Sequence, residues 1–261
     1  MVARLDWSLV VTRSADAQSL GTQLPIESEE HPLPDAGLPF VVRVARGLSR
    51  KPRAPEPTAA APAGTRNPFL PPFEPGLFVQ ELTPTHRVLL NKFNVFAHHA
   101  LVVTTGFEPQ AQRLGLPDFD ALHRCLEGVD GLVFYNSTAV AGASQPHRHL
   151  QVIPLPVPLV PGKVQLPCLA DLVPLPASPD GSLRAYREAL ARLGRDHDGA
   201  DYNLLCTREW MLIVPRARES VGEISLNALA FAGSFFVKTE AQLAHLRATG
   251  PATALKLATG G

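Results

Sequence analysis

The distribution of proline is the feature that most restricts how this chain can fold. Of its 26 prolines, eight lie in residues 51–76 and eight in residues 154–179. Proline fixes φ and removes a backbone hydrogen-bond donor, so neither region can form a regular helix or a central strand. We therefore expect a loop rich in Pro and Ala over residues 51–64, and a connector between two parts of the fold over residues 154–179.

Between the proline-rich regions, the pattern of apolar residues predicts a mixture of strands and helices. The expected strands are residues 38–44, 100–104, 131–135 and 149–155, followed by the hairpin-like pair 204–207 and 210–214. The expected helices begin near Asp118, cover residues 183–193, and occupy the end of the chain from Ala230.

The irregular alternation of strands and helices, without a βαβ series, favours an α+β fold. We divide the chain into an N-terminal part over residues 1–160, a proline-rich connector over residues 161–182, and a C-terminal part over residues 183–261 that completes the fold.

Composition excludes several classes of function. The formal net charge of the 261 residues is zero, so no global field attracts nucleic acid or an anionic membrane. No segment is long and apolar enough for a transmembrane helix, and the charged residues Arg4, Asp6 and Arg13 argue against a signal peptide. Three widely spaced cysteines suit neither a disulfide framework nor a cysteine zinc site. We expect a cytoplasmic protein without nucleic-acid or membrane partners.

One strand carries an unusual row of polar side chains. Because successive side chains of a strand point to opposite faces, His147, His149 and Gln151 share one face, while Arg148 and Leu150 share the other. Two imidazoles and an amide rarely cover an apolar core, and they are typical of a reaction centre. We call these three residues the histidine row.

The residue types of the row suit chemistry at phosphorus or at an acyl carbon. An imidazole of ordinary pKa, about 6.5, is mostly neutral at pH 7 and is then a good nucleophile. The Gln151 amide can donate to an anionic oxygen without adding charge. The small residues from Gly142 to Gln145 would let a phosphate approach the backbone.

A His-x-His pair is also common in metal sites and as a structural pair. A cupin would place a carboxylate a few residues later, and a metallo-hydrolase would place an Asp and a further His directly after the pair. Residues 151–155 contain neither. Spacing alone leaves the nucleophilic, metal-binding and structural interpretations open.

The order small-Ser-Gln-x-His-x-His-x-Gln at a strand resembles the histidine-triad superfamily, in the branch of galactose-1-phosphate uridylyltransferase and the diadenosine tetraphosphate phosphorylases. In that branch Gln replaces the third His. Segments resembling the phosphorylases recur over nearly the whole chain: residues 39–44, 67–72, 82–86, 90–95, 130–136, 141–145, 202–211 and 227–234.

This resemblance implies a mostly antiparallel sheet flanked by helices and an ATP adenylyltransferase activity that converts diadenosine tetraphosphate and phosphate into ATP and ADP. It implies that His149 attacks the α-phosphorus to form an adenylyl-histidine, that His147 orients and stabilises the site, and that Gln151 holds the α-phosphate oxygens. The rest of the phosphate chain would lie against four residues: Gly142, Ala143, Ser144 and Gln145.

The resemblance also marks positions for further contacts with the nucleotide, the ribose or the distal phosphates. These candidates are Lys51, Asn91, Lys92, Asn136, Asn203, Thr207, Met211 and Lys256. Each has a plainer alternative, such as a solvated loop, a surface turn or, for Met211, the core. No tightly bound cofactor or protein-held metal is expected, and a divalent cation such as Mg²⁺ would accompany the polyphosphate.

Other functions remain open at this point. A related nucleotidylyltransferase would use a sugar phosphate, a hydrolase would use water, and a silent nucleotide-binding protein would only sense the dinucleotide. By analogy with the family, Gln151 disfavours simple hydrolysis. Both a monomer and a homodimer are compatible with the sequence.

Overall fold

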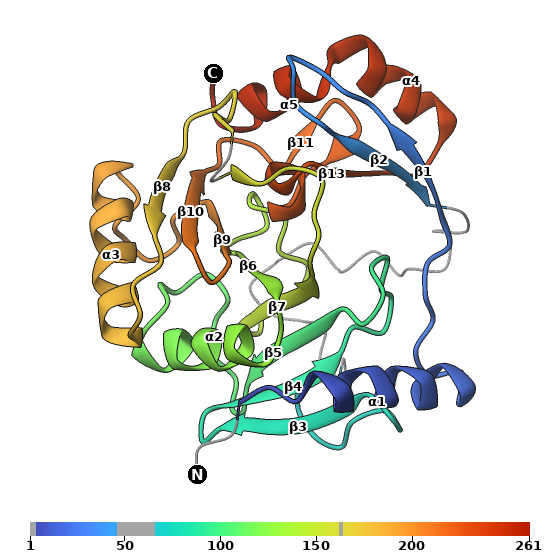
Figure 1. Ribbon diagram of the computed structural model, residues 1–261, viewed down its shortest axis with the longest axis vertical. Coiled ribbons are helices and arrows are strands. Elements are labelled where there is room, and N and C mark those ends of the chain that lie inside the picture. Colours follow the sequence, from blue (N-terminus) through green and yellow to red (C-terminus); the bar gives the residue numbers. More distant parts are fainter. Residues whose placement is uncertain (1–3, 46–65, 162–163) are drawn as a thin grey trace.

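An eight-stranded sheet, antiparallel at each pairing, forms the centre of the computed structural model (Figure 1). The structure describes residues 4–45, 66–161 and 164–261. The expected loop at residues 51–64, with the candidate Lys51, lies outside the described residues.

The strand that carries His149 and Gln151 is central in this sheet, and His147 lies two residues before it, in an isolated bridge to Pro109. In spatial order the strands are β3 (Phe78–Thr83), β4 (His86–Leu90), β5 (Ala100–Thr104), β7 (His149–Pro154), β6 (Gly131–Asn136), β9 (Tyr202–Cys206), β10 (Trp210–Pro215) and β8 (Asp171–Pro174). Strand β7 lies between β5 and β6 and pairs with both. Its backbone is therefore held from two sides, which fixes the side chains that it presents.

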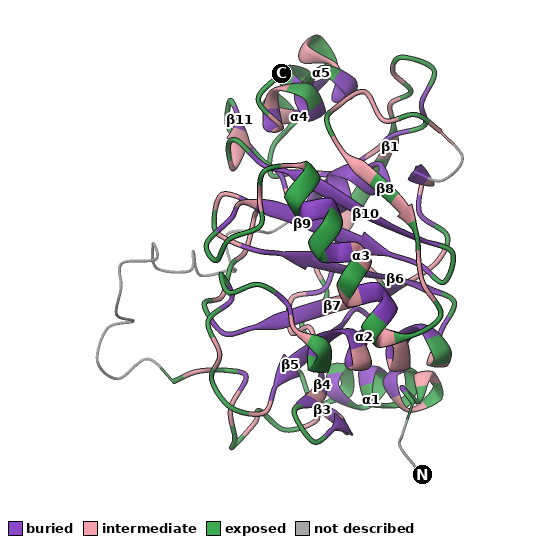
Figure 2. Ribbon diagram, turned by 90° about the vertical axis from the view of Figure 1, so that its left-hand side faces the viewer, coloured by how far each residue is buried: buried purple, intermediate pink, exposed green. Residues whose placement is uncertain are grey.

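Three helices cover one face of the sheet, and two of them, α2 and α3, are seen lying over it in Figure 2. They are α1 (Trp7–Ser19), α2 (Leu116–Gly128) and α3 (Pro179–Arg192). Their apolar residues, among them Val10, Phe119 and Tyr186, join the buried side chains of the strands in one core. In the described part of the chain, no helix has the length and apolarity needed to cross a membrane.

The helix expected near Asp118 begins slightly earlier. Its N-cap is Gly115, which has no side chain to cap with, and the Asp118 carboxylate accepts the Gly115 N–H at 2.7 Å from within the first turn. A carboxylate there also suits the positive end of the helix dipole. Asp118 thus closes the start of the helix from its third position.

The opposite face of the sheet is covered by a second layer, which is built from segments of the N-terminal and C-terminal parts of the chain. It contains a three-stranded sheet in the order β1 (Ser28–Pro32), β2 (Val41–Ala45), β13 (Ser234–Val237), the pair β11 (Ser220–Val221) and β12 (Ile224–Ser225), the 3-10 helix η3 (Ala228–Ala232), and helices α4 (Glu240–Thr249) and α5 (Pro251–Ala258). Strand β2 pairs in parallel with β13, so the N-terminal and C-terminal parts share one small sheet.

The α+β class and the mostly antiparallel sheet are confirmed. The strand expected at residues 100–104 coincides with β5, and the expected hairpin is the pair β9–β10. The connector contributes β8, which takes an edge position, where proline is tolerated. The chain end is more varied than one helix, because β13 separates η3 from α4 and α5.

Candidate active site

The histidine row lies on the sheet face that α1, α2 and α3 leave free. On this face, β6 and β7 contribute Phe134 and Ile153 to one apolar cluster, while Leu101 and Val103 of β5 belong to another. Leu150, between His149 and Gln151, points to the opposite face and packs in the core under α1, α2 and α3, which we call the helix-side core. This is the alternation that a strand predicts. The row therefore occupies a polar strip between two apolar clusters.

Arg148, between the two histidines in sequence, points to the other face. Its guanidinium lies 2.6 Å from the Glu108 carboxylate and 3.3 Å from that of Asp118. The His86 ring lies 3.2 Å from the other oxygen of Asp118. These groups line a cavity of about 320 Å³ on that side. Arg148 thus anchors the strand from behind and does not face the row.

His149 is presented as a neutral imidazole with one defined tautomer. Its Nδ1 lies 2.8 Å from the His147 carbonyl oxygen, which can only accept, so Nδ1 carries the proton. The lone pair is then on Nε2, which no hydrogen bond within the described residues occupies. The side chain is 3% exposed. Burial lowers the pKa of His149 to about 4, and the bond to the carbonyl opposes part of this effect.

His147 has both ring nitrogens engaged. Nε2 lies 3.0 Å from the Thr104 carbonyl oxygen and 2.8 Å from the hydroxyl of the same residue. The proton therefore sits on Nε2, and Nδ1 accepts from the Asn67 amide at 2.8 Å. Burial lowers the pKa of His147 as well. His147 joins three segments, and its carbonyl sets the tautomer of His149.

Phe69 is a site residue that the sequence pattern did not single out. Its ring centroid lies 5.2 Å from that of His149 and 5.7 Å from that of His147. The ring is buried and belongs to the smaller apolar cluster of this face. Phe69 therefore shields both imidazoles from water, which favours their neutral forms. The only sequence signal was its place in segment 67–72.

Gln110 was also missed. Its Oε1 accepts the His149 N–H at 2.8 Å, while its Nε2 donates to the Asn136 carbonyl at 2.7 Å and to the His149 carbonyl at 3.3 Å. This buried amide takes the place of the backbone hydrogen bonds between β6 and β7 beside His149. A single loop glutamine gives no periodic signal, which is why the sequence did not reveal it.

Gln151 and Asn91 are connected through a third residue. The Gln151 Oε1 lies 3.0 Å from His99 Nε2, and the Asn91 Nδ2 lies 3.2 Å from His99 Nδ1. Lys92, next along the chain, instead forms an ion pair with Glu74 at 2.7 Å. The structure thus brings Asn91 to the histidine row through His99, whereas Lys92 is engaged at the surface.

The turn at residues 142–145, which the sequence predicts to bind phosphate, uses some of its backbone donors internally. The Gly142 N–H donates to the Ala139 carbonyl at 2.9 Å, and the Ala143 N–H donates to the Thr138 carbonyl at 2.8 Å. These two backbone donors are therefore used inside the turn, which corrects the role expected of them. Within the described residues, the backbone N–H groups and side-chain donors of Ser144 and Gln145 have no hydrogen-bond partner, so they remain available to a phosphate.

Asn136 and Asn203 hold this turn in place. The Asn203 amide donates to Asn136 Oδ1 and to the Ala141 carbonyl, both at 2.8 Å, and its Oδ1 accepts from Arg216 at 2.8 Å. Arg216 also reaches the Leu226 carbonyl at 3.0 Å. Burial lowers the pKa of Arg216 to about 10, so it remains a cation at pH 7. Nothing in the sequence pointed to Arg216. The sequence predicted nucleotide contacts for Asn136 and Asn203, whereas the structure shows their amides bonded to each other and to the turn.

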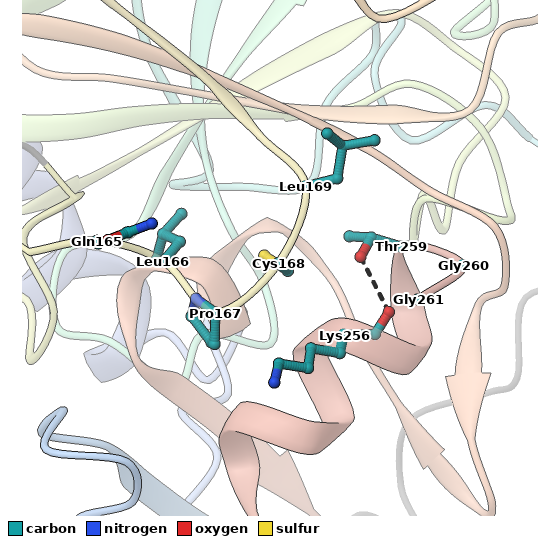
Figure 3. A pocket seen from close by; sticks show the side chains of 9 residues that line it. All are labelled: Gln165, Leu166, Pro167, Cys168, Leu169, Lys256, Thr259, Gly260 and Gly261. Carbon is teal, nitrogen blue, oxygen red and sulfur yellow. Dashed lines mark hydrogen bonds between the residues drawn. The ribbon is translucent and has the colours of Figure 1, made fainter.

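The structure does not bring the last three candidates to the histidine row. Met211 is buried in the helix-side core, on the opposite face of the sheet. Thr207 lies just after the C-terminal end of β9, whereas Asn203 lies near the start of that strand. The Thr207 hydroxyl accepts the Glu209 N–H. Lys256 lines a separate cavity of about 680 Å³, beside residues 165–169 and the last residues of the chain (Figure 3). No residue of the row lines that cavity.

The arrangement suits attack on phosphorus more than metal binding. Among the described residues, no group of three or more His, Cys, Asp or Glu side chains could hold a metal ion. The row and the turn before it instead combine the neutral imidazole of His149 with uncharged donors from Gln151, Ser144 and Gln145. Such a set can form a bond to phosphorus and stabilise charge on the non-bridging oxygens.

Two family models together match almost the whole chain. The model of the Ap4A phosphorylase N-terminal domain matches residues 3–173, and that of the ATP adenylyltransferase C-terminal domain matches residues 159–259. Diadenosine 5',5'''-P1,P4-tetraphosphate phosphorylase 2 of Saccharomyces cerevisiae is 27% identical, over 84% of this chain and 82% of that protein. Protein APA1 of the same yeast is 26% identical, over 79% of this chain and 78% of that protein.

Solved structures have the same fold. The crystal structure of yeast Ap4A phosphorylase Apa2 superposes with a TM-score of 0.84 at 23% identity, covering 100% of this chain and 98% of that one. The complex of Apa2 with Ap4A gives the same values, and the complex with AMP gives a TM-score of 0.78 at 24% identity, with the same coverage.

Proposed function

This chain belongs to the Ap4A phosphorylase family, and from that membership we propose that it cleaves diadenosine tetraphosphate (Ap4A) with inorganic phosphate to give ATP and ADP. One observation of the site carries the proposal. The His147 carbonyl holds the proton of His149 on Nδ1, which leaves a neutral, buried Nε2 as the nucleophile.

In the first step, the Nε2 lone pair of His149 attacks the α-phosphorus. An N–P bond forms while the bond from that phosphorus to the bridging oxygen breaks, so ATP leaves and AMP stays on the imidazole. The adduct makes the ring cationic, and the Nδ1–H bond to the His147 carbonyl stabilises this charge. Burial that disfavours protonation of the free ring keeps the lone pair available.

In the second step, an oxygen of inorganic phosphate attacks the same phosphorus. The N–P bond breaks, ADP leaves, and His149 returns to its neutral form. Gln151 donates to the non-bridging α-oxygens in both steps, and Ser144 and Gln145 receive the remaining phosphates. These donors are uncharged, so any divalent cation enters bound to the polyphosphate.

Product analysis tests this function directly. The purified protein is incubated with Ap4A and ³²P-labelled inorganic phosphate, and the nucleotides are separated. We expect ATP and ADP in equal amounts, with the label in the β-phosphate of ADP and no turnover without phosphate. Phosphate-independent release of AMP would instead identify a hydrolase, and complete inactivity with intact Ap4A binding would identify a sensor.

A further inference from the structure

A chain of hydrogen bonds leads from Asn91 through His99 to Gln151. Asn91 directly follows β4, and His99 directly precedes β5, the strand that pairs with β7. The Asn91 backbone N–H donates to the His99 carbonyl at 2.9 Å. The side chains then continue from Asn91 to His99 at 3.2 Å and from His99 to Gln151 at 3.0 Å.

The direction of each hydrogen bond follows from the first amide. The Asn91 Oδ1 accepts the Phe93 N–H at 3.1 Å, so the amide nitrogen must face His99. That nitrogen can only donate, so His99 Nδ1 accepts and the ring proton sits on Nε2. This Nε2–H then donates to the Gln151 Oε1.

The position of Asn91 is itself fixed from α1. Its carbonyl accepts from the Gln23 amide at 3.1 Å, and the buried Gln23 Oε1 accepts from Ser14 of α1 at 2.7 Å. Both polar atoms of the Asn91 side chain are used inside the protein, so the direct substrate contact expected from the sequence gives way to a structural bond.

The bond from His99 determines which end of the Gln151 amide faces the substrate. With Oε1 held by His99, the Nε2 of Gln151 has no hydrogen-bond partner within the described residues. An N–H donates to an α-phosphate oxygen, whereas the reversed amide would present a carbonyl that repels it. We propose that His99 and Asn91 are positioning residues that orient the Gln151 amide, with its N–H groups toward the α-phosphate. This inference rests on the proposed function.

A double-mutant cycle on the adenylylation of His149 tests the proposal. Single-turnover rates are measured for wild type, His99→Leu, Gln151→Ala and the double variant. We expect Gln151→Ala to slow the step by about 100-fold and His99→Leu by about 10-fold, with small changes in Ap4A affinity. Because His99 acts through Gln151, the double variant should be no slower than Gln151→Ala alone.

Two variants separate positioning from a general structural role. His99→Gln keeps an N–H near the Nε2 position and should recover most of the rate lost in His99→Leu. His86→Gln changes a buried histidine on the other sheet face, and its effect should multiply with that of Gln151→Ala. The proposal is overturned if His99→Leu costs the same factor in the presence and absence of Gln151.

A second measurement does not depend on turnover. Long-range ¹H–¹⁵N NMR spectra of the free protein at pH 7 should show His99 neutral, with its proton on Nε2. A proton on Nδ1 would reverse the amide of Gln151 and overturn the inference. If wild type forms no adenylyl-histidine, the proposed function is wrong, and the NMR result alone decides how Gln151 is oriented.

Discussion

At the scale of single residues, the reactivity proposed for His149 depends on where its ring carries a proton. One hydrogen bond, to a carbonyl that cannot donate, selects the tautomer, and burial beside Phe69 selects the neutral form. Neither effect requires a charged neighbour. The neutral Nε2 that we propose as the nucleophile is therefore prepared by the shape of the strand and by the exclusion of water.

The pH dependence of adenylylation should reflect this environment. The pKa of His149 is about 4 in the folded protein and near 6.5 when the ring is exposed. The native state thus favours the neutral ring, so the stability from this preference is complete above pH 6.5 and is lost as the pH falls toward 4. We expect the single-turnover rate to fall on the acid side with a midpoint near 4.

Single-turnover rates from pH 3.5 to 8, with folding monitored at each pH, measure this midpoint. A midpoint near 6.5 in folded protein would show that His149 is not buried as described. His149→Gln should also weaken the dependence of unfolding free energy on pH between 6.5 and 4, a range over which the buried ring contributes about 3 kcal/mol.

At the scale of elements, Gln110 completes the pairing of β6 and β7 where their backbones separate. Gln110→Ala leaves the buried His149 N–H and two carbonyls without partners, so we expect a loss of about 2 kcal/mol in the free energy of unfolding and slower adenylylation. Urea denaturation measures the first effect. Gln80→Ala, which removes a half-buried amide on β3 whose hydrogen bonds to Arg4 and Asp6 lie at the surface, should cost less than 1 kcal/mol.

The turn that presents Ser144 and Gln145 depends on Gly142. Its φ is +91°, and an added Cβ would lie 2.8 Å from the Leu226 carbonyl oxygen. Gly142→Ala should therefore cost about 1–3 kcal/mol of stability and weaken Ap4A binding. Gly199, with a φ of +77° and open space around it, provides the matched control. Equal losses for the two variants in thermal unfolding would contradict a close approach at Gly142.

Sequence periodicity predicted the elements whose apolar pattern is simple. Strands β5 and β6 were predicted because their β-branched and apolar residues form short continuous runs, and β7 because polar and apolar residues alternate at its start. Helix α1 was missed because its apolar residues Val10 and Val11 are mixed with charged and polar ones, and because its stability depends on packing against β3 and β4. Residues 28–32 contain two glutamates, a histidine and a proline, so β1 gave no strand signal.

The sequence predicts which candidate residues lie together where these residues are close along the chain. The row from His147 to Gln151 follows from strand geometry alone. Phe69, Gln110 and Arg216 come from other segments, and only tertiary contacts reveal them. Asn136 and Asn203 are candidates through the resemblance to the family, but the sequence cannot show that their amides bond to each other.

At the scale of the whole molecule, one sheet passes through both parts of the chain. Strands β9 and β10 follow the connector in sequence, yet β9 pairs with β6 beside the histidine strand. Arg216 joins the turn at Ala141 to the C-terminal part. The position of His149 and that of the turn at residues 141–145 therefore depend on both parts of the chain.

A fragment of residues 1–160 should accordingly fail to fold alone. It lacks β9, which leaves the edge of β6 unpaired, and it lacks η3 and β13, which exposes the apolar cluster on that face. We expect the fragment to bind a hydrophobic dye, to give no near-ultraviolet circular dichroism, and to unfold without a cooperative transition. A cooperative transition like that of the full chain would show that the two parts fold independently.

In the proposed reaction, Nε2 of His149 carries the adenylyl group, and this covalent adduct can be measured directly. The protein is mixed with Ap4A in the absence of phosphate, digested without acid, and analysed by mass spectrometry. We predict one added AMP on His149, released as ADP when phosphate is added. His149→Ala should show neither adduct nor turnover, with at least a 10⁴-fold loss of rate, while His123→Ala on α2 keeps both. An adduct elsewhere, or turnover by His149→Ala, would contradict the account.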